Sequence, residues 1–116
     1  MDSDAGDAVF FALASAPRRR MLDLLVDHPG LYVEALASHF PMTRHAVMKH
    51  LKALEDAGLV LSERDGRKRR LYFNAVPIQQ IYDRWTDRFS AFWSSRMADI
   101  KSRLEANIQQ KETRRA

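Results

Sequence analysis

The sequence contains no cysteine, which excludes a disulfide framework, a thiolate metal site, an iron–sulfur cluster and a cysteine nucleophile. No apolar run approaches the roughly 18 residues of a membrane-spanning helix. The start of the chain, Met1 to Asp4, is acidic, whereas a secretory signal starts with basic residues. The four glycines do not form a phosphate-cradling loop. These absences predict a soluble cytoplasmic protein that is not an enzyme and has no catalytic residues, metal or cofactor.

The 116 residues fit a single domain, residues 1–116, because domains most often have about 100–150 residues. The formal net charge of +4 is unevenly distributed along the chain. Residues 42–70 hold eight Lys and Arg against four Asp and Glu, and the rest of the chain holds eleven of each sign. A basic block in an otherwise neutral protein is typical of a surface that binds a polyanion, and the alternative is an ordinary solvated surface.

Apolar spacing predicts three helices in the first part of the chain, over residues 4–14, 17–28 and 33–40. Ser15 is a suitable cap for the second helix, with Pro17 in its first turn. A very short strand is expected at residues 31–32. Pro41 ends the third helix, because the residue before a proline avoids the helical region.

The next helix has the strongest pattern in the sequence. Thr43 is a suitable cap, apolar residues recur at helical spacing, and Gly58 is a normal terminator. Two extended runs around Asp65-Gly66 then predict a β-hairpin. Two helices joined by a short turn are a helix-turn-helix, and a hairpin directly after it is a wing, here about residues 59–74. The basic block coincides with the second helix of this motif and the wing, which favours binding of nucleic acid.

A long last helix is predicted over residues 77–110. At about 1.5 Å per residue it would be about 50 Å long, whereas a globule of this size is about 35 Å across. Its apolar stripe would form a large exposed patch in a monomer. We therefore predict a homodimer in which this helix and the first helix, residues 1–14, form the interface. The interface residues are Phe10, Phe11, Leu13, Ile81, Trp85, Phe89, Phe92, Trp93, Ile100 and Leu104.

Four segments resemble the ArsR-type winged helix-turn-helix repressors. Residues 14–25, ASAPRRRMLDLL, are similar to the family's opening L-A-D-P-T-R-R-x-I-L-x-L-L. Residues 45–54, HAVMKHLKAL, resemble its recognition helix, x-A-V-S-x-H-L-x-x-L. AGLV at 57–60 and GRKRRLY at 66–72 resemble the family's A-G-L-V and its G-R-x-R wing. The likeness runs from about Phe10 to Pro77 in order and without gaps.

The resemblance implies a mainly α fold with a small β-hairpin (α+β), in which residues 15–76 form the DNA-binding core. It also implies a dimeric transcriptional regulator. One departure is Met48, where the family usually has serine. The family's metal sites have no counterpart here, because residues 31–36 offer no ligand pair and the chain from Pro77 onward has no histidine.

The predicted DNA-contacting residues lie on the recognition helix and the wing. A helix that buries Val47, Leu51 and Leu54 turns Arg44, Met48 and Lys52 outward on one row. Arg44 is the candidate for a guanine, and Met48 for a thymine methyl group. His50, near the buried edge, is expected to form a structural hydrogen bond. The full set is Thr43, Arg44, His45, Met48, Lys49, Lys52, Arg67, Lys68 and Arg70.

Two alternatives remain open from the sequence. A winged helix can serve as a protein-interaction module without DNA binding, although interfaces of that kind are depleted in lysine. The regulator could also respond to an organic ligand in a dimer cleft lined by Trp85, Phe89, Phe92 and Trp93. The partners predicted from the sequence are double-stranded DNA and a second copy of the chain, with no membrane and no identified effector.

Overall fold

The computed structural model describes residues 3–86 and 91–115, and the chain divides into two compact units. Unit 1 is Met1–Ile81 and unit 2 is Tyr82–Ala116. The sequence predicts a single domain over residues 1–116, whereas the contacts within the chain group it into these two units.

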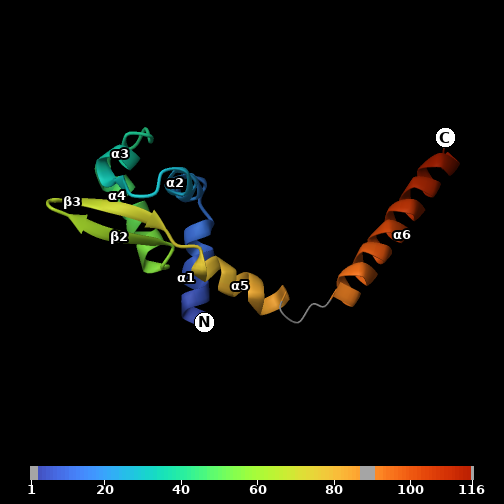
Figure 1. Cartoon of the computed structure of the whole chain (residues 1–116). Coiled ribbons are helices and arrows are strands. Elements are labelled where there is room, and N and C mark those ends of the chain that lie inside the picture. The colour runs from blue at the N-terminus through green and yellow to red at the C-terminus, as the bar shows by residue number, and fades with distance from the viewer. Residues whose placement is uncertain (1–2, 87–90, 116) are drawn as a thin grey trace. The chain divides into compact units, whose positions relative to one another are not determined.

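Unit 1 contains helices at its start, a small sheet and a second set of helices between the strands (Figure 1). α5 crosses the boundary between the units, and α6 lies in unit 2. In chain order the elements are α1 (Ser3–Leu13), α2 (Ala16–Asp27), β1 (Leu31–Tyr32), α3 (Val33–Ala37), α4 (Arg44–Asp56), β2 (Val60–Asp65), β3 (Lys68–Phe73), α5 (Val76–Thr86) and α6 (Ala91–Arg115).

Side-chain caps fix where α2 and α4 begin. The hydroxyl of Ser15 accepts a hydrogen bond of 3.4 Å from the backbone N–H of Arg18, and Pro17 lies in the first turn of α2. The hydroxyl of Thr43 likewise accepts from the N–H of Ala46 at 3.1 Å. α4 therefore begins where the sequence predicts, and α2 begins at Ala16, one residue before the predicted start. α3 is shorter than expected and ends at Ala37.

The three strands form an antiparallel sheet in the order β1-β3-β2. Asp65 pairs with Lys68, so the loop of the hairpin is Gly66-Arg67 and Asp65 belongs to β2. Gly66 has φ +64°, a left-handed conformation that glycine adopts without a steric cost. Figure 1 shows the hairpin of β2 and β3 extending beyond the helices as a wing.

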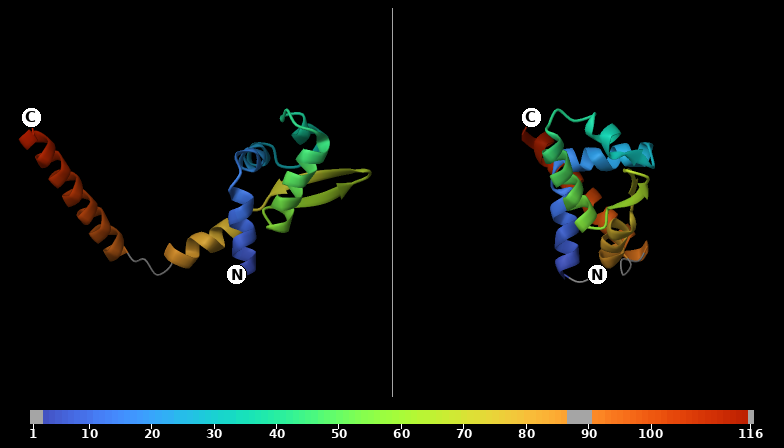
Figure 2. Two further views of the ribbon diagram at one scale, coloured as in Figure 1. Left: turned by 180° about the vertical axis from the view of Figure 1, so that it is seen from behind. Right: turned by 90° about the vertical axis from the view of Figure 1, so that its left-hand side faces the viewer.

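The core of unit 1 lies where α1, α2, α3, α4 and the base of the wing meet. Its largest fully buried side chains are Met21, Leu25, Leu36, Leu51, Leu54, Leu59, Leu71, Val9 and Val47. The left-hand view of Figure 2 shows α4 crossing in front of the base of the hairpin. The predicted α+β winged helix-turn-helix fold is confirmed.

The sequence predicts a single helix over residues 77–110 in the last part of the chain. The structure describes two helices, α5 and α6, and residues 87–90 between them lie outside the described part. The predicted interface residue Phe89 falls there, and the side chain of Phe92 also lies outside the description. None of the helices within residues 3–86 and 91–115 is long and apolar enough to cross a membrane.

Candidate nucleic-acid interface

The outer face of α4 presents basic side chains in its first two turns. Arg44, His45 and Lys49 are exposed, while Val47 and Leu51 on the opposite face are buried. The hydroxyl of Thr43 caps this first turn by accepting a hydrogen bond from the backbone N–H of Ala46. An exposed basic helix end of this kind fits the major groove of DNA, which admits an α-helix.

Two of the predicted contact residues on α4 have acidic partners. A guanidinium nitrogen of Arg44 lies 3.9 Å from a carboxylate oxygen of Glu34 on α3, and these side chains are 67% and 55% exposed. Such an exposed pair is worth about 0–1 kcal/mol, so Arg44 can leave it for DNA. Lys52 donates a hydrogen bond of 2.9 Å to Asp56 one turn along α4, and this contact raises the pKa of the lysine. Asp56 therefore offsets much of the charge of Lys52.

Met48 does not face outward as the sequence predicts. Its side chain is half-buried and packs against the core of unit 1. It also lines a hollow between α4 and the wing with Leu51, Lys52, Glu55, Asp56 and Arg69. Arg44, Met48 and Lys52 lie on one row of α4, but the wing covers this row at Met48. Only the exposed part of the Met48 side chain could therefore contact DNA.

The wing tip carries exposed basic residues. Arg67 occupies the loop and Lys68 begins β3, and both are exposed. Sequence reasoning missed Arg64, an exposed residue of β2 that pairs with Arg69. Because directly paired residues project to the same face of a sheet, Arg64 lies on the face from which Arg69 reaches α4. Strand alternation counted from buried Leu71 could have identified it.

Arg69 attaches the wing to α4. A guanidinium nitrogen of Arg69 lies 3.4 Å from Oε1 of Glu55. That oxygen is buried and accepts no hydrogen bond from the described residues, so the contact is an ion pair without good hydrogen-bond geometry. The pair lies beside Met48 in the same hollow and fixes the wing against α4.

Arg70 is held by neighbouring groups on the other face of the wing, whereas the sequence predicts that it faces DNA. Its Nε donates to Asp65 at 3.1 Å, a second nitrogen donates to the carbonyl of Gly30 at 3.2 Å, and its guanidinium lies 4.4 Å from the ring centre of Tyr32. Tyr32 donates a hydrogen bond of 2.6 Å to the same oxygen of Asp65. We call Tyr32, Asp65 and Arg70 the wing brace.

The pKa directions agree with these contacts. The hydrogen bond from Tyr32, and then the one from Arg70, hold the pKa of Asp65 below its ordinary value. The same hydrogen bond to Asp65 raises the pKa of Tyr32. The brace therefore holds β1 against the hairpin with an ionised aspartate at neutral pH.

The proposed interface residues differ in exposure. Phe10 and Phe11 on α1 are 50% and 64% exposed, whereas Leu13 and Ile81 are partly buried against the core. In unit 2 the exposed apolar residues are Tyr82, Trp85, Trp93, Met97, Ile100, Leu104 and Ile108. Unit 1 and unit 2 thus each carry exposed apolar side chains.

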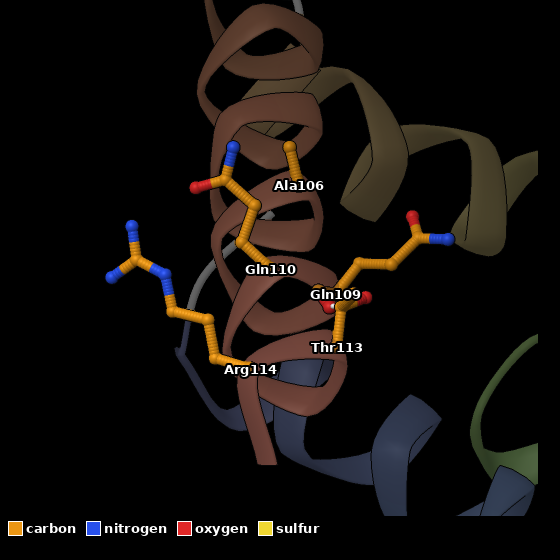
Figure 3. Close-up of a pocket in the computed structure, with 5 residues that line it drawn as sticks. All are labelled: Ala106, Gln109, Gln110, Thr113 and Arg114. Carbon is orange, nitrogen blue, oxygen red and sulfur yellow. Dashed lines mark hydrogen bonds between the residues drawn. The ribbon is translucent and has the colours of Figure 1, made fainter. Parts of the chain in front are cut away.

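The remaining surface hollows of α6 do not form a ligand site. Figure 3 shows Ala106, Gln109, Gln110, Thr113 and Arg114, which all come from α6. Residues of one helix cannot enclose a ligand. Within the described ranges, no three His, Asp or Glu side chains gather as metal ligands.

Comparison with known proteins points to one class of protein. The sequence model of the MarR family matches residues 15–70. An uncharacterised HTH-type transcriptional regulator, YuzN of Bacillus subtilis (strain 168), is 39% identical over 87 residues, which are 70% of this chain and 95% of YuzN.

Solved structures give the same picture. An ArsR-like transcriptional regulator from Rhodococcus sp. RHA1 is 32% identical, with a TM-score of 0.66 over 89% of this chain and 93% of that one. The ArsR family transcriptional regulator RHA00566 is 28% identical, with a TM-score of 0.67 over 82% and 96%. These are regulators, and their similarity covers the winged core described above.

Proposed function

The chain belongs to the helix-turn-helix transcriptional regulators of the ArsR/MarR type, and we propose that it acts in the cytoplasm as a homodimeric, sequence-specific repressor on a pseudo-palindromic DNA site. Regulators of this kind bind DNA and are not enzymes. The observation that carries the proposal is the exposed basic end of α4 together with the basic wing tip of the same unit.

The proposed contacts divide by chemistry. Arg44, in the first turn of α4, contacts a guanine, because a guanidinium can bind both acceptors on that base edge. Thr43 and His45 lie beside it and contact bases or phosphates. Lys49 and the wing-tip residues Arg67 and Lys68 contact phosphates. Met48, Lys52 and Arg70 contribute less, since each is partly buried or paired within the protein.

Arg64 joins the proposed set. Arg64 is exposed on the wing face from which Arg69 reaches α4. A wing that lies along the duplex would therefore bring Arg64 near the phosphate backbone of the DNA. Its contribution is electrostatic, because phosphate contacts position a protein on DNA without reading its sequence.

Dimerisation is proposed from the exposed apolar residues of both units. An exposed apolar patch on a monomer marks an interaction site, and two-fold pairing is the commonest way to cover one. Two copies would place two α4 helices about one DNA turn apart, roughly 34 Å, on a symmetric site. Repression follows because a dimer bound across a promoter excludes other proteins from the same DNA.

The finer placement we propose is the ArsR branch. The ArsR-type segments of the sequence and the 32% and 28% identity to two ArsR-type structures support it. The MarR match covers the helix-turn-helix core that both branches share.

The test is the salt dependence of binding to a random-sequence duplex. Lys49, Arg64, Arg67 and Lys68 of both copies make eight phosphate contacts in this proposal, so log K should fall with log salt with a slope of about −7. A flat response would contradict DNA binding. The site itself is then selected from a random pool of duplexes by the wild-type protein.

Arg44→Ala separates base contacts from phosphate contacts. We expect it to lower affinity for the selected site at least tenfold while leaving random-duplex affinity within about threefold, because a bidentate base contact is worth about 1–3 kcal/mol. Lys49→Ala is the matched control and should weaken both kinds of duplex equally. Equal losses from Arg44→Ala would show that Arg44 contacts phosphate only.

A further inference from the structure

One side chain in unit 1 joins three helices. Arg18 belongs to α2, and its Nε donates a hydrogen bond of 2.8 Å to the carbonyl of Ala12 at the end of α1. Its Nη2 donates to the carbonyl of Phe11 at 2.9 Å, and its Nη1 lies 3.1 Å from Nδ1 of His50 on α4. A cation at these carbonyls also suits the negative end of the α1 dipole.

The contact between Arg18 and His50 determines the state of the imidazole. A guanidinium is always protonated and only donates hydrogen bonds, so Nδ1 of His50 must accept. His50 is therefore neutral with its proton on Nε2. Burial and then the charge of Arg18 lower the pKa of His50, which favours this neutral form at physiological pH.

The side chains that line the hollow beside His50 include no partner for its protonated form. A hollow of about 320 Å³ lies beside it, lined by Phe11, Arg18, Ala46, Lys49, His50 and Ala53. α2 supplies the cation Arg18, α4 supplies the cation Lys49, and α1 supplies the apolar Phe11. No acidic side chain is among these residues, so protonation of His50 turns an acceptor into a donor facing two cations.

We propose that Arg18 and His50 are positioning residues that hold the recognition helix α4 at a fixed place relative to α1. The role rests on the proposed function, in which α1 takes part in the dimer interface. Val9 and Ala12 of α1 are buried in the core, and Phe10 and Phe11 are exposed. If the exposed side of α1 packs against the second copy, α1 connects the two α4 helices of the dimer. The contact between Arg18 and His50 then fixes the distance between the two α4 helices and so the spacing between half-sites.

Arg19 is a matched control from the same helix turn. It also donates a hydrogen bond to a carbonyl at the end of α1, to Leu13 at 2.7 Å. Within the described residues that is the one hydrogen bond of its side chain, and it does not reach α4. Arg19→Ala therefore removes the same charge and a comparable bond to α1 while leaving the connection to α4 intact.

The first measurement compares spacing. Duplexes carry the site selected by the wild-type protein, with one or two base pairs added or removed between its halves. We expect Arg18→Ala to weaken binding to the selected spacing about tenfold and to flatten the preference among spacings. Arg19→Ala should bind like the wild type. Thermal unfolding of each variant shows whether unit 1 remains folded at the assay temperature.

The second measurement is a pH series in the His45→Gln background, because an imidazole facing DNA would strengthen binding when protonated. α4 is held in place only when His50 is neutral. The affinity for DNA should therefore fall as the pH drops below about 6.5 and level off below the lowered pKa of His50. His50→Gln keeps an oxygen acceptor that does not titrate, so it should bind well without this decline. His50→Leu should bind weakly at every pH.

Two outcomes would overturn the proposal. One is a wild-type spacing preference in Arg18→Ala, and the other is an unchanged acid decline in His50→Gln. The ring nitrogen resonances of His50, measured without DNA, test the contact itself. A proton on Nδ1 of the wild type would exclude it, whereas a neutral Nε2–H ring that changes in Arg18→Ala supports it. Failure of the proposed function would instead appear as a missing salt dependence while the ring resonances stay as expected.

Discussion

At the scale of single residues, the partners of a basic side chain indicate what it does. Arg18, Arg19 and Arg70 bind backbone carbonyls, and Arg69 pairs with a largely buried glutamate. Lys49, by contrast, is exposed and free of any recorded ion pair within the described residues. The composition counts all of these residues as positive charge. Only a basic side chain without an ion pair, such as Lys49, is free to neutralise phosphate.

The wing brace should make the stability of the fold depend on pH in the acid range. Because the pKa of Asp65 is lowered in the folded protein, its carboxylate stabilises the fold above the ordinary carboxyl range, and this stabilisation is lost as the pH falls through the lowered value. Asp65→Asn should therefore lower Tm at pH 7, and the difference from the wild type should shrink at strongly acid pH.

Glu63→Gln is the control for Asp65→Asn. Glu63 lies on the same strand and the same face as Asp65, and it accepts no hydrogen bond among the described residues. It loses the same charge, so we expect little change in Tm at any pH. If both variants shift Tm equally at pH 7, net charge and not the brace is responsible.

At the scale of elements, the end of α4 is closed by a Schellman motif. The N–H of Leu59 bonds to the carbonyl of Leu54 and that of Gly58 to the carbonyl of Glu55, both at 2.9 Å. Gly58 has φ +74°, and the side chains of Leu54 and Leu59 are fully buried. The turn thus directs the chain from the recognition helix into the wing.

Gly58→Ala should lower the free energy of unfolding by about 1–2 kcal/mol, the cost of a left-handed residue with a Cβ. The cost is conformational, because a Cβ at this position would lie 3.6 Å from Pro77 Cγ, an ordinary contact. Gly58→Asn should cost less, since asparagine tolerates this conformation. Urea unfolding with an unchanged m value measures both. Equal losses of unfolding free energy in the two variants would show that the left-handed conformation of Gly58 is not the cause.

The sequence predicts α4 well because its signals are local. Thr43 at the start, Gly58 at the end and the spacing of Val47, Leu51 and Leu54 need no knowledge of the rest of the chain. The sequence does not reveal the partners of Met48 and Arg70, because these partners lie on other elements, in the core beside the wing and at Gly30. Helical and strand periodicity give the direction of a side chain but not what another element places there.

The site is predicted only in part for the same reason. The basic block of residues 42–70 identifies the surface, yet it includes Lys52, Arg69 and Arg70, which have partners within the protein. The contact of Arg18 with His50 spans 32 residues and joins two segments that sequence spacing cannot relate. Only the structural role of His50 was expected, from its place beside Leu51.

At the scale of the whole molecule, the exposed apolar side chains of α6 are the basis of the proposed dimer. Trp93, Met97, Ile100 and Leu104 recur at helical spacing, so they form one stripe along α6, and all four are exposed. Most helices in proteins are stabilised by packing of an apolar face against another element. In the proposed dimer, a second copy of the chain supplies such a face.

Ile100→Gln combined with Leu104→Gln should therefore convert the dimer to monomers, measured as the sedimentation coefficient over a range of protein concentrations. Ser95→Gln combined with Ser102→Gln is the control, because these serines lie on the opposite side of α6 and the change adds the same polar groups.

On DNA, the monomeric variant should lose most of its affinity for the selected symmetric site, since each half-site would have to be bound separately. Each protomer should still bind a random duplex with its own share of the salt dependence, because α4 and the wing belong to unit 1. A variant that remains dimeric would show that α6 is not required for pairing, and the exposed Phe10 and Phe11 of α1 would be tested next.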